Sequence, residues 1–201
     1  MDDLTIRTAT SPVRIEIEKI KGSRFIADLS PVDSHAKAMA FLEATRGREP
    51  SATHHVWAYR LATGQTRSND DGEPVGTAGS PILHRLEEAG VADVIVVITR
   101  YYGGTKLGRG GLRRAYGRAT GTVLATADMV TTPVTTPMRL VFAYDLTAMA
   151  ESAISAHGAT VTAASYAGQV TMDLEVPVAK VDKLSEDLIE ASAGRISISS
   201  T

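Results

Sequence analysis

Residues 91–99 (VADVIVVIT) constrain the fold of this chain more than any other stretch. Every residue in the run is apolar except Asp93 and Thr99. Successive side chains of a strand point to opposite faces of the sheet, so a run without alternation is apolar on both faces. Such a strand is stable only where both faces are covered. We therefore predict a strand that is buried on both sides within its sheet.

The residues around this strand carry alternating strand and helix signals. Residues 13–19 alternate apolar and polar side chains, as in a half-buried strand. Asp33 and Ser34 are both residue types that cap helices, so a helix is expected to begin there. Residues 62–77 are polar and are expected to form a long loop. The expected order is ββαβαβα, with strands at 13–19, 24–29, 54–61 and 91–99 and helices at 33–44, 81–89 and 111–127.

The last third of the chain has a simpler pattern. Residues 131–137 (TTPVTTP) carry no charge and two prolines, which is typical of a linker. The elements after it follow the order βαββαβ of a ferredoxin-like domain. We therefore predict a two-domain α+β protein: an N-terminal ββαβαβα sandwich at 1–132, a linker at 133–137 and a ferredoxin-like domain at 138–201.

The composition limits the class of protein. The chain has 201 residues and a net charge of −2, so it is not expected to coat nucleic acids or membranes along its whole surface. The charge is uneven, because the part from Pro133 onward is acidic and the part before it is slightly basic. There is no cysteine, which excludes disulfides and a thiol nucleophile. The N-terminus does not resemble a signal peptide, and no apolar run is long enough to span a membrane. A soluble, cytoplasmic protein is expected.

The stretch 99–117 (TRYYGGTKLGRGGLRRAYG) is rich in glycine and basic residues and contains no acid. Glycines let backbone N–H groups converge on an anion, and the following helix would add partial positive charge. Neither named phosphate loop fits, because Arg109 replaces the lysine of one pattern and Arg113 the last glycine of the other. With both named loops excluded, the remaining functional interpretation is general anion or nucleic-acid binding, in which the tyrosines stack on bases. In the alternative interpretation, the arginines are solvated or paired with acids of the same chain. The candidate binding residues are Arg100, Tyr101, Tyr102, Lys106, Arg109, Arg113 and Arg114.

The stretch 68–79 (SNDDGEPVGTAG) places three carboxylates within four positions. Asp70, Asp71 and Glu73 could hold a divalent cation such as Mg²⁺, although the spacing is not that of a calcium-binding EF-hand. The competing interpretation is a turn, because Asn, Asp and Gly favour tight turns and Thr77 could cap the next helix. In that case Asp71 and Glu73 would serve as counter-charges to the basic glycine-rich stretch.

Two adjacent histidines precede these carboxylates. His54 and His55 lie in an expected strand, so their side chains point to opposite faces. A catalytic dyad of His54 with Asp71 is conceivable, with Glu73 as a third candidate, but no serine or cysteine nucleophile has a recognisable setting. A structural role for the histidines is favoured.

Three stretches together resemble a known family. They are HHVWAYR at 54–60, SNDDGEPVGTAGSPIL at 68–83 and VVITRYYGGTKLGRGGLRRAYG at 96–117. They are similar to the IMPACT family, including its bacterial YigZ-like members, and the resemblance continues into the C-terminal part. The chain departs from the family pattern where Tyr102 replaces Phe, where Thr105 replaces an aliphatic residue, and at Arg109 and Arg113, which replace uncharged residues.

The resemblance implies a first domain like the second domain of a ribosomal small-subunit protein. It implies a second domain similar to the last domain of elongation factor G. Both relatives contact ribosomal RNA, and the eukaryotic family members are implied to regulate a translation-initiation kinase by competing for its activator. No established enzymatic activity comes with the family.

We therefore favour a non-enzymatic protein without a cofactor that binds RNA or the ribosome in translation or its regulation. One alternative is an Mg²⁺-dependent enzyme acting on a phosphorylated small molecule, with Asp70, Asp71 and Glu73 as metal ligands and His54 as acid or base. Another is a protein-interaction module that uses the acidic C-terminal domain to bind a protein partner.

Overall fold

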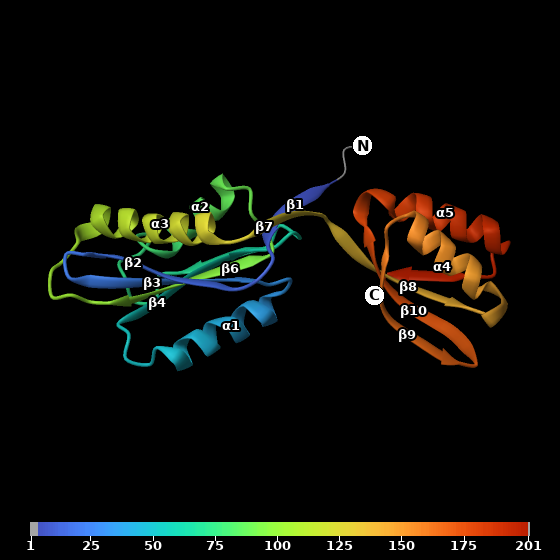
Figure 1. Ribbon diagram of the computed structural model, residues 1–201, viewed down its shortest axis with the longest axis horizontal. Coiled ribbons are helices and arrows are strands. Elements are labelled where there is room, and N and C mark those ends of the chain that lie inside the picture. The colour runs from blue at the N-terminus through green and yellow to red at the C-terminus, as the bar shows by residue number, and fades with distance from the viewer. Residues whose placement is uncertain (1–3, 201) are drawn as a thin grey trace. The chain divides into compact units, whose positions relative to one another are not determined.

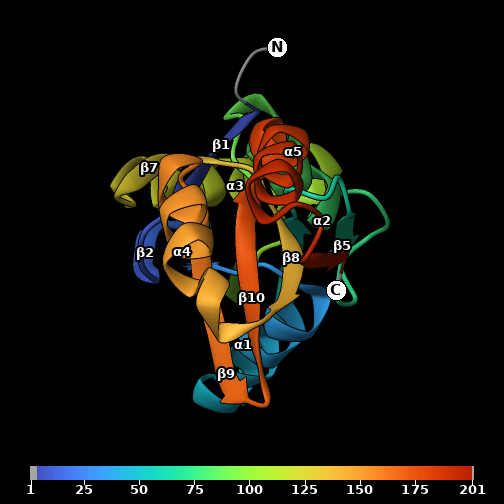
Figure 2. The same ribbon diagram turned by 90° about the vertical axis from the view of Figure 1, so that its right-hand side faces the viewer.

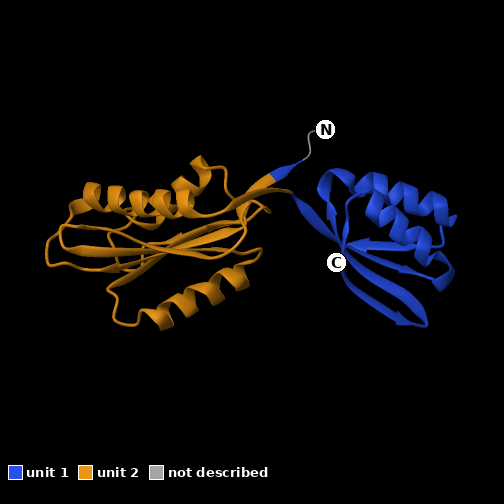
Figure 3. Cartoon of the chain, viewed as in Figure 1, with its two compact units in different colours: residues 1–5, 133–201 blue, residues 6–132 orange. Residues whose placement is uncertain are grey.

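The computed structural model describes residues 4–200, which divide into two compact units (Figure 3). Ile6–Thr132 forms one unit, and the chain from Pro133 onward forms the other together with Thr5 at the start of the first strand. Both units combine helices with antiparallel sheets, so the predicted two-domain α+β class is confirmed. In the described part of the chain, no helix is long and apolar enough to cross a membrane.

The larger unit, Ile6–Thr132, is built on a five-stranded antiparallel sheet with the strand order β2-β3-β6-β4-β5. Its central strand β6 begins at Val94 rather than Val91, because Asp93 adopts a left-handed backbone conformation with φ of 53°. The residues from Val94 to Ile98 are fully buried, which confirms the predicted strand that is covered on both faces. The strands are β2 (Val13–Ile20), β3 (Ser23–Pro31), β4 (His54–Arg60), β5 (Thr66–Asn69) and β6 (Val94–Tyr101).

Helices cover both faces of this sheet (Figure 1). Helix α1 (His35–Arg48) packs Ala38 and Leu42 against Ile95 and Val97 of β6 on one face. Helices α2 (Gly79–Glu88) and α3 (Gly108–Thr126) cover the other face, where β6 presents its alternate side chains. Ser34 caps α1 by accepting a hydrogen bond from the backbone N–H of Lys37, as the sequence predicts.

Several local expectations for this unit are wrong. Part of the predicted loop at 62–77 forms the short strand β5, which pairs with the edge of β4. Helix α3 begins at Gly108, three residues earlier than expected. Two further strands, β1 (Thr5–Ala9) and β7 (Met129–Pro133), form a separate two-stranded ribbon.

The second unit has the predicted order βαββαβ, and its strand order is β11-β8-β10-β9. Helices α4 and α5 lie on the same face of this sheet (Figure 2), where apolar side chains of β8 and β10 meet those of both helices in one core. A ferredoxin-like domain is therefore confirmed. Its elements are β8 (Thr135–Phe142), α4 (Thr147–Ala156), β9 (Thr160–Ala167), β10 (Gln169–Pro177), α5 (Val181–Ser192) and β11 (Ser197–Ser200), with short 3-10 helices at Tyr144–Leu146 and Val178–Lys180.

The predicted linker at 133–137 is not an irregular segment. Pro133 ends β7, and β8 begins at Thr135 and pairs with β10 along its whole length. The threonines explain the error, because β-branched side chains favour extended backbone and strand pairing as readily as a linker.

Two glycines allow backbone segments to meet at one end of the larger sheet. A Cβ on Gly103 would lie 2.0 Å from the carbonyl carbon of Gly22 and 2.2 Å from the backbone nitrogen of Ser23. The backbone N–H of Gly103 also donates to the Ser23 hydroxyl at 3.1 Å. The turn between β2 and β3 is thereby held against the loop that follows β6.

Substituting Gly103→Ala is expected to lower the free energy of unfolding by about 3 kcal/mol, because the methyl group has to displace backbone atoms. Gly121→Ala is the matched control, since nothing lies within 4 Å of its added methyl group and alanine favours a helix interior. Urea unfolding should show the control to be as stable as the wild type or more so. A Gly103→Ala variant with wild-type stability would contradict the close approach.

Candidate functional site

The acidic stretch and the glycine-rich stretch lie side by side in the structure. The guanidinium of Arg109 donates to the carbonyl of Val75 at 3.0 Å, and Nε of Arg113 donates to the carbonyl of Gly76 at 3.2 Å. The two stretches therefore form one region at the start of α2 and α3.

Asp70 organises the acidic stretch by capping α2. Its Oδ1 accepts hydrogen bonds from the backbone N–H groups of Ala78 and Gly79 at 2.9 and 2.8 Å, and its Oδ2 accepts a third backbone N–H. These are donors that a helix start leaves without partners. The predicted cap Thr77 instead donates its hydroxyl to the carbonyl of Pro74 at 2.5 Å. The cap is thus supplied by a residue eight positions before the N-cap Ala78 rather than by the N-cap residue or its neighbour.

Asp71 does not form the predicted dyad with His54. Its left-handed backbone, with φ of 44°, turns the carboxylate toward the backbone N–H of His55 at 2.5 Å and the guanidinium of Arg46 at 3.2 Å. The imidazole Nδ1 of His54 lies 2.7 Å from the backbone carbonyl of Asp71 and not from its carboxylate. His54 therefore donates to a carbonyl and fixes the turn.

Glu73 forms a buried ion pair beneath this turn. Its side chain is 4% exposed, and Oε1 accepts hydrogen bonds from Arg100 Nη1 at 2.5 Å and from the Tyr116 hydroxyl at 2.8 Å. The imidazole Nε2 of His54 lies 3.8 Å from the same oxygen. Burial, and then the charge of Glu73, raise the pKa of the Tyr116 hydroxyl far above its usual range. Tyr116 is therefore a permanent hydrogen-bond donor to the carboxylate.

Arg100, one of the predicted phosphate-binding residues, is held mainly by partners inside the domain. The residue is buried, and besides Glu73 it donates to the Ser23 hydroxyl at 3.2 Å. Its guanidinium lies between the rings of Phe25 and Tyr102, 5.5 and 5.6 Å from their centroids. The Nη1 and Nη2 groups of Arg100 are therefore committed to partners inside the domain, and only its Nε–H has no acceptor among residues 4–200.

The three predicted metal ligands do not converge. Asp70 faces the start of α2, Asp71 faces β4 and Arg46, and Glu73 faces the interior. Among residues 4–200, no group of three or more His, Asp or Glu side chains is arranged to hold a metal ion. The candidate magnesium site is therefore not formed by these residues, because each carboxylate is directed to a different partner, as the competing turn interpretation expects.

The two tyrosines do not form one stacking platform. Tyr101 donates its hydroxyl to Glu49 at 2.5 Å, which raises the pKa of the tyrosine, and Arg24 lies 5.2 Å from the centroid of its ring. Tyr102, which is 47% exposed, contacts Arg100 on the other face of the sheet. Tyr101 is the last residue of β6, and Tyr102 begins the loop that follows it.

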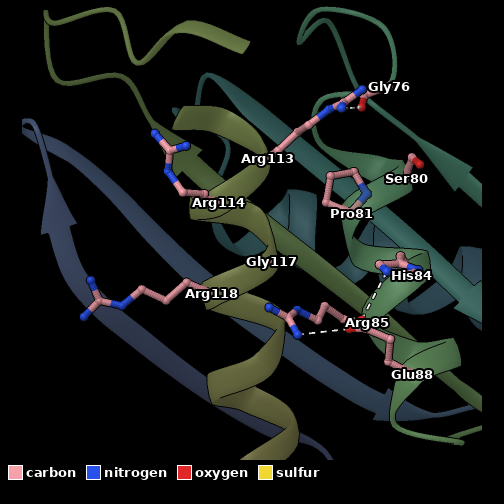
Figure 4. Close-up of a pocket in the computed structure, with 10 residues that line it drawn as sticks. All are labelled: Gly76, Ser80, Pro81, His84, Arg85, Glu88, Arg113, Arg114, Gly117 and Arg118. Carbon is pink, nitrogen blue, oxygen red and sulfur yellow. Dashed lines mark hydrogen bonds and ion pairs between the residues drawn. The ribbon is translucent and has the colours of Figure 1, made fainter. Parts of the chain in front are cut away.

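A basic surface lies on the outer side of the two helices. A groove of about 680 Å³ runs between α2 and α3 (Figure 4). A second hollow of about 230 Å³ on the far side of α3 is lined by Lys21 and by two arginines of the same helix. We call the arginines around these hollows the basic surface; they are Arg85, Arg113, Arg114 and Arg118.

These arginines remain accessible. Arg85 pairs with Glu88 of its own helix at 3.0 Å, and Arg118 pairs with the exposed Glu18 at 3.3 Å. Arg114 is exposed and makes no hydrogen bond or ion pair to the other residues drawn in Figure 4. Exposed pairs of this kind contribute only about 0–1 kcal/mol, so an incoming anion can replace them.

The structure does not bring the seven predicted binding residues together. Arg113 and Arg114 lie on the basic surface, and a separate cavity at the start of α3 is lined by Arg100, Tyr102, Lys106 and Arg109. Tyr101 lines neither. Sequence reasoning missed Arg85 as a partner of the α3 arginines, because α2 and α3 are separate segments of the chain. Arg118 can be recognised from the sequence, because it lies four residues after Arg114 and a helix places both on one side.

Comparisons with known proteins agree with this architecture. The family model described as the Impact N-terminal domain matches residues 21–124, and the domain of unknown function DUF1949 matches residues 140–195. The chain is 35% identical over 195 residues to the IMPACT family member YigZ of Escherichia coli K12, with 94% of each chain covered. It is also 52% identical over 98 residues to an IMPACT family member from Thermus thermophilus, about half of each chain.

More distant and structural matches follow the same division. Rat protein IMPACT is 40% identical over 94 residues, which cover 43% of this chain and 29% of that protein. A crystal structure titled as that of a hypothetical protein matches with a TM-score of 0.75 and 32% identity, over 98% of both chains.

Substituting Glu73→Gln is expected to lower the free energy of unfolding by about 3–5 kcal/mol, because it leaves the charge of Arg100 buried without a counter-charge. The measurement is urea unfolding followed by circular dichroism. Glu87→Gln, an exposed position on α2, is the matched control and should change stability by less than about 0.5 kcal/mol. Equal stability of the two variants would show that the ion pair does not hold this region.

Proposed function

Because this chain belongs to the IMPACT family, we propose that it is a non-enzymatic protein of that family that binds RNA, alone or within the ribosome, through its basic surface. The convergence of four arginines from α2 and α3 around one groove carries the proposal. Arginine is suited to this task, because its planar guanidinium can donate two parallel hydrogen bonds to a phosphate.

The distribution of charge favours the larger unit as the RNA-binding part. From Pro133 onward the chain carries a net charge of −4, whereas the preceding part is +2. Phosphate groups are therefore attracted to the larger unit and repelled by the acidic one. A role in translation or its regulation is the finer part of the proposal, and it rests on the ribosome-contacting domains that the family resemblance implies as relatives of the two domains.

The contacts inside the site support binding rather than catalysis. The carboxylates of Asp70, Asp71 and Glu73 already accept hydrogen bonds from backbone or side-chain donors, and His54 is turned to a carbonyl. Most of the charged groups available to a ligand on the outer side are arginines, with Glu88 as the acid among them. Cations that contact phosphates supply affinity that depends strongly on salt and little on sequence.

RNA binding by the wild-type protein is expected to weaken steeply with salt, with a slope of log K against log salt of about −3 for four phosphate contacts. The double substitution Arg113→Glu/Arg114→Glu should reduce this slope by about 1.5 to 2 and weaken binding at least about tenfold at low salt. Fluorescence anisotropy with a labelled 20-nucleotide RNA, roughly twice the span of α3, measures both quantities.

The control is Lys19→Glu/Lys37→Glu, which changes the net charge by the same amount away from the basic surface. It should leave most of the affinity intact. If both double variants bind equally well, or if wild-type binding is insensitive to salt, the basic surface is not an RNA-binding site.

A further inference from the structure

We propose that the cavity at the start of α3 binds a phosphate monoester. The cavity has a volume of about 350 Å³, within the range of small-molecule sites, and none of the four arginines of the basic surface lines it. It therefore forms a second site, and its existence does not depend on whether the basic surface binds RNA.

The start of α3 supplies backbone donors to this cavity. Leu107, Gly108 and Arg109 line it, and they are the N-cap and the first two residues of a helix of 19 residues. Among the described residues, no side chain caps this helix, and its first turn contains no acid. The N–H groups of a first helical turn lack partners within the helix and carry partial positive charge, which suits an anion.

Three cationic side chains add to the helix start. Lys106 and Arg109 line the cavity from the loop and from the helix, and Arg100 lines it from the end of β6. Arg100 is 4% exposed, and its Nε–H is buried with no acceptor among residues 4–200. Buried donors without a partner are rare in folded proteins, so this atom marks a place where an acceptor is missing.

The one acid in the lining, Glu73, does not reverse this charge. Its Oε1 accepts hydrogen bonds from Arg100 at 2.5 Å and from the Tyr116 hydroxyl at 2.8 Å, so its charge is balanced within the pair. The charge that faces the cavity is therefore set by Lys106, Arg109 and the helix start, and it is positive. A monoester carries up to two charges at neutral pH, whereas the diesters along an RNA strand carry one, so the monoester gains more from this cluster.

The size of the cavity leaves room for more than the phosphate. The partly exposed ring of Tyr102 lies in the wall beside the cations, where an attached nucleoside could contact it. The phosphate monoester has two sources with the same chemistry, a free mononucleotide and the 5′-terminal phosphate of an RNA. The test separates them.

Calorimetry with the full chain tests the site, using inorganic phosphate, AMP and uncharged adenosine as ligands. AMP and phosphate should bind and adenosine should not, and Lys106→Ala/Arg109→Ala should raise the Kd for AMP at least about tenfold. These two side chains are at the surface, and circular dichroism should show the variant to be folded. The Arg113→Glu/Arg114→Glu variant should bind AMP as the wild type does. In ¹⁵N-labelled protein, the amide resonances of Gly108 and Gly110 should shift with phosphate.

Two oligonucleotides, with and without a 5′-phosphate, distinguish the sources in the Arg113→Glu/Arg114→Glu background. Preference for the phosphorylated oligonucleotide supports an RNA end as the ligand. Equal weak binding of both, with AMP binding intact, supports a free nucleotide. The site is refuted if neither AMP nor phosphate binds at about 10 mM, which is well above typical metabolite affinities, or if Lys106→Ala/Arg109→Ala leaves the Kd unchanged.

Discussion

The buried ion pair between Glu73 and Arg100 is the interaction on which the region around the two signature stretches depends. A charge taken out of water is stable only with a counter-charge and hydrogen bonds, so each partner requires the other to be in place. Glu73 belongs to the turn before α2, Arg100 ends β6, and Tyr116 joins them from α3. One carboxylate therefore fixes a loop, a strand and a helix relative to one another.

This arrangement explains why so many polar residues of the signature stretches are not available to a ligand. Asp70 caps α2, Asp71 holds the strand and Arg46, and Ser23 bridges Arg100 and the backbone of Gly103. Each bond satisfies a backbone or charged group that would otherwise be costly to bury. Although these loops make few apolar contacts, their polar contacts hold the starts of α2 and α3 in place. The rigid scaffold displays the exposed arginines, which make few internal contacts of their own.

The fold could be predicted from sequence where a pattern is local. The apolar run at 91–99 identified the buried strand, and the order of elements after 138 identified the ferredoxin-like domain. Site residues were harder, because their roles depend on partners remote in sequence: Arg100 meets Glu73 across 27 residues, and Asp70 caps a helix from outside it. Tyr101 and Tyr102 are neighbours among basic residues, which suggested a shared role. Tyr101, however, ends β6 and donates to Glu49, whereas Tyr102 begins the next loop and lies over Arg100.

The contrast between residues that are paired inside the domain and arginines that are exposed is also relevant to other members of the family. Glu73 and Arg100 form a buried ion pair and Gly103 lies in close backbone contact, so we expect a chain that builds this region in the same way to carry equivalent groups. Among the described residues, the hydrogen bonds of the exposed Arg109 and Arg113 go to the backbone carbonyls of Val75 and Gly76, and neither arginine is paired with a buried acid. With Tyr102 and Thr105, they are the positions at which the sequence departs from the pattern that the family resemblance implies. Relatives can thus share the framework around the ion pair and still differ in the ligands that the outer faces of α2 and α3 attract. Substitutions of exposed charged residues usually change stability little, whereas substitutions of buried or closely packed residues are costly.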